Sequence, residues 1–597
     1  MPVYTAPVKD TQFILQDVLH LENYANLEGF ADATPDTVAA VLEQGGKFCE
    51  EVLHPLNQSG DAEGCTRLPD GSVTTPKGFK DAYRQFIESG WGTLSMPTEF
   101  GGQGLPHVVG IAFNEYLISS NMAFAMYPGL THGAISSILV RGSEEQQKTF
   151  VPKMVSGEWL GTMNLTEPHC GTDLGLLRTK AEPQADGSYK ITGTKIFISS
   201  GENDLAENII HLVLAKIVGA PDNVKGISLF IVPKVHVNAD GSLGEKNQVS
   251  CGSIEHKMGI KGSATCVMNY DGATGYLVGE REKGLQAMFI MMNAARLGVG
   301  QQGMGVSEIA YQNAAKYAKE RIQGRALTGP ADPTAKADSI LVHPDVRRML
   351  LDARAFNEAA RGFVLWGGLL VDLAHKAATP EEREHADDLI SLMTPVIKGY
   401  LTDGGYAAAT NCQQVFGGHG YVEEWGMSQF VRDARIAMIY EGANGIQALD
   451  LVGRKLAQNG GRAIRAFFAM VAQICADNKS DAQMTPYIAP LEKALGHLQA
   501  GTMWLMQNGL ANPDNAGAAS YAYMQLMGHV CLGLTWAKMA RAALDKLADG
   551  ASDESFYKNK LILARHFAER TLPETGSLLR KIEAGSENLM AMAIADF

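Results

Sequence analysis

One carboxylate in this sequence is placed where it could act as a base. Glu441 lies within residues 432–446 (RDARIAMIYEGANGI), between an apolar run and a glycine-bracketed turn. Apolar surroundings raise the pKa of a carboxyl group toward the range in which it accepts a proton during catalysis. The alternative is a solvated glutamate that only ends a helix. Taken alone, the segment leaves both interpretations of Glu441 open.

Three further segments carry side chains that suit a flat, polar ligand. Residues 164–173 (NLTEPHCGTD) form a loop fixed by Pro and Gly that offers hydroxyls and backbone donors. Residues 195–201 (KIFISSG) are predicted to form a strand in which Phe197 and Ser199 share one face. Residues 414–421 (QVFGGHGY) have glycines that admit a phosphate close to the backbone. Each also has a plain structural interpretation, as a turn, a half-buried strand and a helix end.

A fourth segment imitates a nucleotide-binding motif. Residues 298–303 (GVGQQG) match the GxGxxG spacing, but the preceding residues have a helical pattern and no βαβ unit follows. We therefore reject a dinucleotide fingerprint here and expect these small residues to permit close packing between helices.

Composition excludes several classes of protein. The 597 residues carry a net charge of −14, which argues against nucleic-acid binding because that function needs a basic face. The eight cysteines include no CxxC pair, so we expect neither a metal site nor disulfides, but reduced thiols in a cytoplasmic protein. A secretory signal and an apolar run of about 18 residues are both missing, so no membrane span or membrane partner is expected.

The elements that must position these residues follow the order helical, β, helical, helical. We expect four domains, with residues 459–461 as a linker: 1–156 helical, 157–282 β, 283–458 a helical bundle, and 462–597 an extra helical domain. Short β runs separated by Asp-Gly turns predict a small antiparallel sheet or barrel. In the last domain, breaks are expected at 512–514 and Gly550. A buried helix stripe is expected at Tyr521, Met524, Gly528, Leu532, Trp536, Met539, Ala543 and Leu547.

In this order, the motifs resemble those of the acyl-CoA dehydrogenase family. Residues 164–173 resemble its signature TEPxxGSD, and 195–201 resemble its K-x-W-I-T/S flavin strand. Residues 320–325, 414–421 and 432–442 are similar to its ER-x-x-FG, QxxGGxGY and RDxxxxxIYEG motifs. The resemblance covers residues 10 to about 460. It implies a multidomain α+β fold with an N-terminal helical domain, a middle β-barrel domain and a C-terminal helical bundle.

The resemblance implies an FAD-dependent enzyme that converts an acyl-CoA into the trans-2-enoyl-CoA. Glu441 is implied as the base that takes the α-proton, while the β-hydrogen passes as hydride to flavin N5. Some family members carry the base just before the position of Arg296, where this chain has Ala295. The implied FAD-binding residues are Leu165, Thr166, Gly171, Thr172, Phe197, Ser199, Arg321, Gln414, Gly417 and Gly418. The implied substrate-binding residues are Thr172, Arg296, Tyr440, Glu441 and Gly442. Thr and Gln, which often contact flavin in the family, are replaced here by Ala443 and Gly445.

The chain beyond residue 460 and the segment 258–266 (MGIKGSATC) resemble a long-form subgroup of the family. Its members act on short acyl-CoA thioesters such as 3-(methylthio)propanoyl-CoA in bacterial dimethylsulfoniopropionate breakdown. The resemblance also implies an electron-transfer flavoprotein as acceptor, and a homodimer in which Arg321 and Gln414 reach the partner's FAD. Three alternatives stay open: a different short- or medium-chain acyl-CoA, an oxidase that uses oxygen, and a catalytically silent flavin- or CoA-binding protein.

Overall fold

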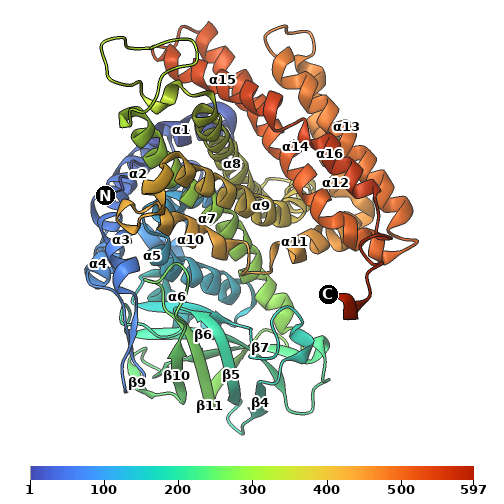
Figure 1. Cartoon of the computed structure of the whole chain (residues 1–597). Helices are drawn as coiled ribbons and strands as arrows, with labels where there is room; N and C mark the ends of the chain where they lie inside the picture. The colour runs from blue at the N-terminus through green and yellow to red at the C-terminus, as the bar shows by residue number, and fades with distance from the viewer. Residues whose placement is uncertain (1) are drawn as a thin grey trace. The chain divides into compact units, whose positions relative to one another are not determined.

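The computed structural model describes residues 2–597, which form two compact units (Figure 1). The helical unit comprises the chain up to Gly46, Pro106–Ser119 and Val299–Phe597. The sheet unit comprises Lys47–Leu105 and Ser120–Gly298. Two long helices, α5 (His107–Arg141) and α7 (Gly284–Glu320), contribute residues to both units. The division into four consecutive domains stays a prediction.

The sheet unit is built on a seven-stranded sheet whose central strands close into a ring. The strands of this sheet are β3 (Trp159–Asn164), β4 (Lys180–Pro183), β5 (Tyr189–Ser199), β6 (Asn208–Ile217), β7 (Ile227–Pro233), β10 (Val249–Ile254) and β11 (Thr265–Val278). Strand β11 pairs with β5, β5 with β4, β4 with β6, β6 with β7, and β7 again with β11. This closure agrees with the predicted barrel.

The predicted antiparallel sheet is in fact a mixed one, because β6 runs parallel to both β3 and β4. The strand β6 (NIIHLVLAKI) is buried along nearly its whole length, and such continuous apolar runs are typical of strands covered on both faces. Its sequence therefore lacks the alternation that would have distinguished the two kinds of pairing. Smaller elements complete the unit: α3 (Pro55–Glu63), α4 (Phe79–Glu88), α6 (Glu144–Val155), and the pairs β1 (Thr66–Arg67) with β2 (Val73–Thr74) and β8 (Val235–Val237) with β9 (Leu243–Lys246).

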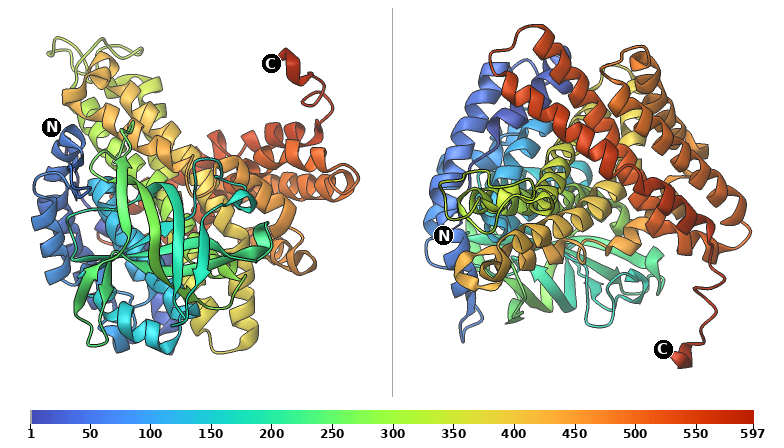
Figure 2. Two further views of the ribbon diagram at one scale, coloured as in Figure 1. Left: turned by 90° about the horizontal axis from the view of Figure 1, so that it is seen from below. Right: turned by 45° about the horizontal axis from the view of Figure 1, so that its top comes forward.

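The helical unit contains the two long helices α8 (Pro344–Lys376) and α9 (Pro380–Val415), which pack against each other. The remaining helices are α1 (Val8–Phe13), α2 (Pro35–Phe48), α10 (Met427–Ala437), α11 (Asn444–Asp450), α12 (Arg462–Asn478), α13 (Thr485–Asn508), α14 (Pro513–Ala548), α15 (Glu554–Arg570) and α16 (Glu574–Glu583). We call α12–α16 the C-terminal extension. Figure 2 shows its last residues leading away from the other helices, and Glu587 to Phe597 are exposed.

The predicted interruptions of the extension are confirmed. Asn512 caps α14 by accepting a hydrogen bond from the Asp514 N–H, and Gly550 follows the helix with a positive φ of 76°. The predicted stripe of α14 is buried from Met524 to Ala543 and half-buried at Leu547. Its first member differs, because Tyr521 is 44% exposed and directs its hydroxyl to a carboxylate.

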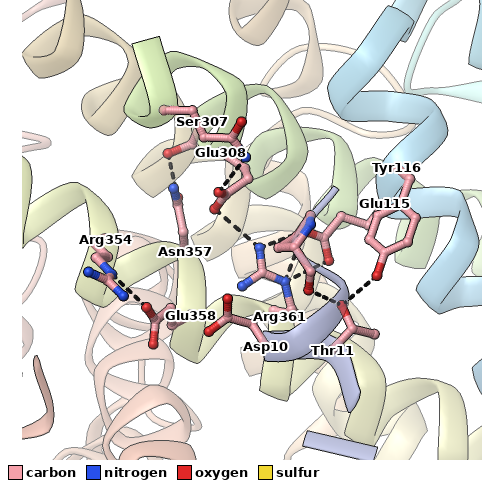
Figure 3. A network of polar contacts seen from close by, with 12 residues as sticks. Asp10, Thr11, Glu115, Tyr116, Ser307, Glu308, Arg354, Asn357, Glu358 and Arg361 are labelled. Carbon is pink, nitrogen blue, oxygen red and sulfur yellow. Dashed lines mark hydrogen bonds and ion pairs between the residues drawn. The ribbon is translucent and has the colours of Figure 1, made fainter. Parts of the chain in front are cut away.

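A buried network of charges links α1, α5, α7, α8 and α15 within the helical unit (Figure 3). The Arg361 guanidinium donates to Glu115 at 2.7–2.9 Å and to Glu308 at 3.1 Å. Although burial lowers it, these carboxylates raise the pKa of Arg361 well above its ordinary value. Nearby, the buried Lys560 of α15 donates to Glu358 and Asp10. The buried Lys560 therefore attaches the extension to α1 through Asp10 and to α8 through Glu358.

By length and apolar composition, α5 is the one helix among residues 2–597 that could cross a membrane. However, 61% of its apolar window is buried inside the protein, and the backbone is extended at Asn121. These properties are those of a core helix, so α5 is weak support for a membrane span.

Candidate active site

Glu441 lies in a tight turn between two helices. Helix α10 ends at Ala437, α11 begins at Asn444, and the Asn444 N–H donates to the Met438 carbonyl at 3.1 Å to close the turn. Glu441 has a φ of 56° and Gly442 a φ of 84°. A left-handed conformation is strained for Glu, and such strain persists only where the surroundings over-determine it. The sequence correctly placed Glu441 at a break between helices, and the structure adds this strained backbone.

Buried polar side chains form hydrogen bonds with the backbone carbonyls of this turn. The Lys398 ammonium donates to the Gly442 carbonyl at 2.7 Å and to the Asn444 side-chain oxygen at 2.8 Å. The Gln447 amide donates to the Glu441 carbonyl at 3.1 Å and to the Gly442 carbonyl at 3.0 Å. Lys398 and Gln447 are fully buried. The two carbonyls flanking the strained position therefore each have a fixed donor.

The residues that precede Glu441 in the turn are largely apolar. Glu441 is half-buried and follows Ile439, which is half exposed, and Tyr440, which is half-buried. The Tyr440 hydroxyl donates to the Gln302 side chain. Burial, followed by the neighbouring Glu441 charge, raises the pKa of Tyr440, so its hydroxyl stays protonated as a donor. A half-buried carboxylate on a fixed turn is suited to accept a proton from a bound molecule.

In the sheet unit, the loop 164–173 is anchored by the buried side chain of Glu167. Its carboxylate accepts from the Arg178 N–H at 2.8 Å, the Thr179 hydroxyl at 2.6 Å and the Lys195 ammonium at 2.9 Å. Although burial raises it, Lys195 and these hydrogen bonds bring the pKa of Glu167 below its ordinary value. Burial lowers the pKa of Lys195 to about 8, against the effect of Glu167. Lys195 also donates to the Leu165 carbonyl at 3.0 Å, which ties the loop to β5.

Strand β5 is bulged next to this loop. The register with β11 shifts between Cys266 and Met268, and Phe197 has a φ of 59° with 60% of its surface exposed. Lys195 and Ile198, three positions apart, are both buried, so the bulge interrupts the alternation assumed from the sequence. An exposed aromatic ring held in a strained conformation is a typical feature of a binding site.

The polar groups beside Phe197 are open to a ligand. Within residues 2–597, the hydroxyls of Thr166, Thr172 and Ser199 have no hydrogen-bond partner, although the Thr166 carbonyl accepts from the Ile196 N–H at 2.9 Å. Gly171 is exposed, and a side chain there would meet no other atom within 4 Å. The loop and the strand therefore present unpaired hydroxyls and an exposed aromatic ring.

In the helical unit, the end of α7 packs against the segment that contains the predicted residues Gln414, Gly417 and Gly418. Tyr317 stacks on Phe416 with 4.2 Å between ring centroids, and its hydroxyl bonds to His419 at 2.9 Å. Arg321 lies one turn after Tyr317, and Gln414, Gly417 and Gly418, which are close to Phe416 in the chain, are exposed. Side chains added at the two glycines would meet nothing within 4 Å, so their backbone is open to a ligand.

The remaining residues considered in the sequence lie as follows. Residues 298–303 lie inside α7, where a Cβ on Gly300 or Gly303 would come within 2.5 Å of α9, as expected for close helix packing. Arg296 is 4% exposed. All eight cysteines are unpaired, and the described residues contain no group of three His, Cys, Asp or Glu suited to a metal.

Several residues that shape the site were missed from the sequence. Lys398 lies in a buried stretch of α9 (MTPVIKGYL), and a lone lysine in an apolar run is the signal that could have identified it. Asn444 and Gln447 look like ordinary residues of a helix start. The side-chain partners of Asn444 lie more than forty positions away in sequence, so no local pattern reveals them, and the Gln447 amide reaches the nearby turn carbonyls only because the turn folds back on α11.

Sequence models of acyl-CoA dehydrogenase domains match four successive parts of this chain. The acyl-CoA dehydrogenase N-terminal, middle and C-terminal domains match residues 36–158, 162–273 and 282–456. A model described as acetyl-CoA dehydrogenase C-terminal like matches residues 467–593, which lie in the C-terminal extension.

Characterised proteins resemble the chain over its whole length. It is 42% identical to the 3-methylmercaptopropionyl-CoA dehydrogenase of Ruegeria pomeroyi, over 99% of this chain and all of that one. It is 34% identical to a butyryl-CoA dehydrogenase of Syntrophomonas wolfei, over 99% of this chain and 98% of that one.

Solved structures share the fold. The structure of Caenorhabditis elegans ACDH-11 in complex with C11-CoA aligns with a TM-score of 0.78 and 18% identity, covering 98% of this chain and 95% of that one. The acyl-CoA dehydrogenase of Bacillus anthracis complexed with FAD aligns with a TM-score of 0.74 and 21% identity, covering 92% and 88%.

Proposed function

This chain belongs to the acyl-CoA dehydrogenase family, and on that basis we propose that it oxidises 3-(methylthio)propanoyl-CoA, with Glu441 as the base. It is an FAD-dependent oxidoreductase that acts on an acyl-CoA thioester. The single observation that carries the role of Glu441 is its half-buried carboxylate on a strained, doubly supported turn.

The chemistry of the donor groups fits FAD. The hydroxyls of Thr166, Thr172 and Ser199, with the exposed ring of Phe197, suit the polar edge and flat face of an isoalloxazine ring. The exposed Arg321 guanidinium suits a pyrophosphate, and the open backbone at Gly417 admits it closely. We assign the same role to the neighbouring residues Leu165, Gly171, Gln414 and Gly418. When bound, FAD accepts the β-hydrogen with its electron pair.

Glu441 removes the α-proton of the acyl group. As the Cα–H bond breaks, the proton goes to the Glu441 carboxylate and negative charge develops toward the thioester carbonyl oxygen. By resemblance, the Glu441 N–H binds that oxygen, and a fixed turn keeps this donor in place during charge development. Departure of the β-hydrogen as hydride then leaves the trans-2-enoyl-CoA. Thr172, Arg296, Tyr440 and Gly442 are proposed to line the acyl-CoA.

Glu441→Gln tests the assignment of the base. We expect this variant to keep its FAD, measured by visible absorbance, and to lose bleaching of the flavin by acyl-CoA. Glu424→Gln, at an exposed carboxylate, is the matched control and should bleach like the wild type. Full bleaching by Glu441→Gln would remove Glu441 as the base.

The substrate follows from the 42% identity along the full chain to a 3-methylmercaptopropionyl-CoA dehydrogenase, a name for the same thioester. Flavin reduction should be compared for 3-(methylthio)propanoyl-CoA, butanoyl-CoA and octanoyl-CoA. The highest kcat/KM is expected for the methylthio substrate. A clear preference for butanoyl-CoA would support the alternative represented by the butyryl-CoA dehydrogenase relative.

The acceptor, assembly and location of the enzyme are part of the same proposal. An electron-transfer flavoprotein is the expected acceptor, so hydrogen peroxide should form in far less than one equivalent per turnover; stoichiometric peroxide would indicate an oxidase. A homodimer is expected because, by resemblance, Arg321 and Gln414 reach the partner's FAD, and light scattering measures this. Eight unpaired cysteines support a cytoplasmic location.

A further inference from the structure

The carboxylate of Asp403 connects the Glu441 turn to the C-terminal extension through hydrogen bonds. The Asn444 side-chain N–H group donates to Asp403 Oδ1 at 2.7 Å, while the Asn444 oxygen accepts from Lys398. Lys398 in turn donates to the Gly442 carbonyl. A continuous hydrogen-bonded path therefore runs from Asp403 to the backbone next to Glu441.

The other oxygen of Asp403 is bound by the extension. Asp403 Oδ2 accepts from the Gln525 side chain at 2.7 Å and from the Tyr521 hydroxyl, both on α14. Burial raises the pKa of Asp403, and the hydrogen bonds from Tyr521, Asn444 and Gln525 oppose that rise. Each Asp403 oxygen thus faces a different side: one faces the turn and the other faces α14.

Close packing between α9 and α14 makes this contact possible. A Cβ on Gly528 would lie 2.2 Å from the Tyr400 ring, and one on Gly399 would lie 2.3 Å from the Met524 sulfur. The two helices therefore approach through glycines at both places. The hydrogen bond between the Tyr400 hydroxyl and His529, at 2.7 Å, fixes their register one turn from Asp403.

We propose that the C-terminal extension positions the base of the reaction: Tyr521 and Gln525 orient Asp403, which through Asn444 and Lys398 holds the strained Glu441–Gly442 turn. The inference rests on the proposed role of Glu441. Tyr521 and Gln525 act as positioning residues, since they touch Asp403 and no reacting atom. Tyr521, at the start of the α14 stripe, is 44% exposed, and its hydroxyl is bound to Asp403.

The test compares two tyrosines two positions apart on α14. Tyr521→Phe combined with Gln525→Met removes both donors from α14 to Asp403 Oδ2 and leaves the donor from Asn444 in place. Tyr523→Phe removes a buried hydrogen bond of 2.7 Å to Thr502, which stays within the extension and does not reach the turn. In single-turnover experiments, the double variant should reduce its flavin about tenfold more slowly, because part of the free energy of the two lost hydrogen bonds is transmitted through Asn444 and Lys398 to the turn, with acyl-CoA affinity within about twofold. Tyr523→Phe should leave both values within about twofold, whatever its effect on Tm.

Two readouts separate positioning from general stability. Backbone amide exchange of residues 441–447 should become faster in the double variant and stay unchanged in Tyr523→Phe. An acyl-CoA with sulfur in place of the β-carbon can lose its α-proton but has no β-hydrogen, so its α-exchange in D2O follows Glu441 alone; this exchange should slow in parallel with flavin reduction.

Different outcomes refute the role of the extension and the role of Glu441. Equal behaviour of the double variant and Tyr523→Phe in flavin reduction and amide exchange overturns the role of the extension. Persistent bleaching in Glu441→Gln overturns the proposed base instead, independently of the two α14 variants. A loss of acyl-CoA affinity with an unchanged reduction rate also refutes positioning of the base, since it would assign the contact to substrate binding.

Discussion

Arg361→Met is the sharpest test of how the helical unit is held together. The substitution keeps a long side chain but removes the positive charge that forms ion pairs with Glu115 and Glu308 (Figure 3). Arg361 and Glu115 are each 1% exposed, so the carboxylates would remain buried without their partner. Removing one member of a buried pair costs about 3–5 kcal/mol. With four hydrogen bonds lost at one guanidinium, we expect about 4 kcal/mol, and a fall in Tm of about 5 °C for a unit of this size.

The assay is urea unfolding followed by far-ultraviolet circular dichroism, with Arg348→Met as the control. Arg348 lies on the same helix α8 and bridges Asp345 and Asp352 at the surface, where such pairs contribute about 1 kcal/mol or less. Adding Glu115→Gln to Arg361→Met should recover part of the loss, because it removes an uncompensated buried charge. If Arg361→Met destabilises the protein no more than Arg348→Met, the network does not contribute as argued.

Three further outcomes are expected. Gly528→Ala should destabilise the protein by about 1–3 kcal/mol, because its Cβ would lie 2.2 Å from the Tyr400 ring. Gly517→Ala on the same helix is the control: its Cβ meets no atom within 4 Å, so this variant should be neutral or stabilising. Equal effects of the two variants in chemical denaturation would argue against close packing of α9 and α14. Lys398→Met should keep FAD but slow flavin reduction by about tenfold or more, because it removes the ammonium that donates to Gly442 and Asn444. An unchanged rate of flavin reduction in stopped-flow experiments would show that the Glu441 turn keeps its conformation without Lys398. Burial lowers the pKa of His211 to about 3 in the folded protein. Between pH 6.5 and about 3, the unfolded state therefore binds more protons than the folded state does. The free energy of unfolding should fall by up to about 1.4 kcal/mol for each unit that pH drops in this range. His211→Gln should flatten this dependence in urea unfolding, relative to the exposed His20→Gln, and an identical slope in both variants would contradict it.

The order of elements and the break at Glu441 could be predicted from sequence, because both depend on local patterns. Helix periodicity, turn residues and the glycines that bracket a turn are all recognised from neighbouring residues in the sequence. The two ends of α14 could be predicted for the same reason. The parallel pairing of β6 was not predictable in this way, since a strand buried on both faces does not alternate. The bulge at Phe197 was also hidden, because a register shift depends on the partner strand.

The support of Glu441 was invisible for a related reason. Lys398 lies more than forty positions before the turn, and Tyr521 lies eighty positions after it, so their convergence is a property of the packed helices α9, α11 and α14. A glutamate in the left-handed region cannot keep that conformation through its own preferences, and its neighbour Gly442 adds freedom rather than restraint. The restraint must come from outside the segment. Here it comes from carbonyl-binding side chains of α9 and α11, which themselves need fixing because a lone lysine and an amide in a core have alternative rotamers. For Lys398, Asp403 supplies that fixing through Asn444, and α14 completes the partners of Asp403. Within the helical unit, therefore, the extension completes the hydrogen-bonding path that restrains the Glu441 turn.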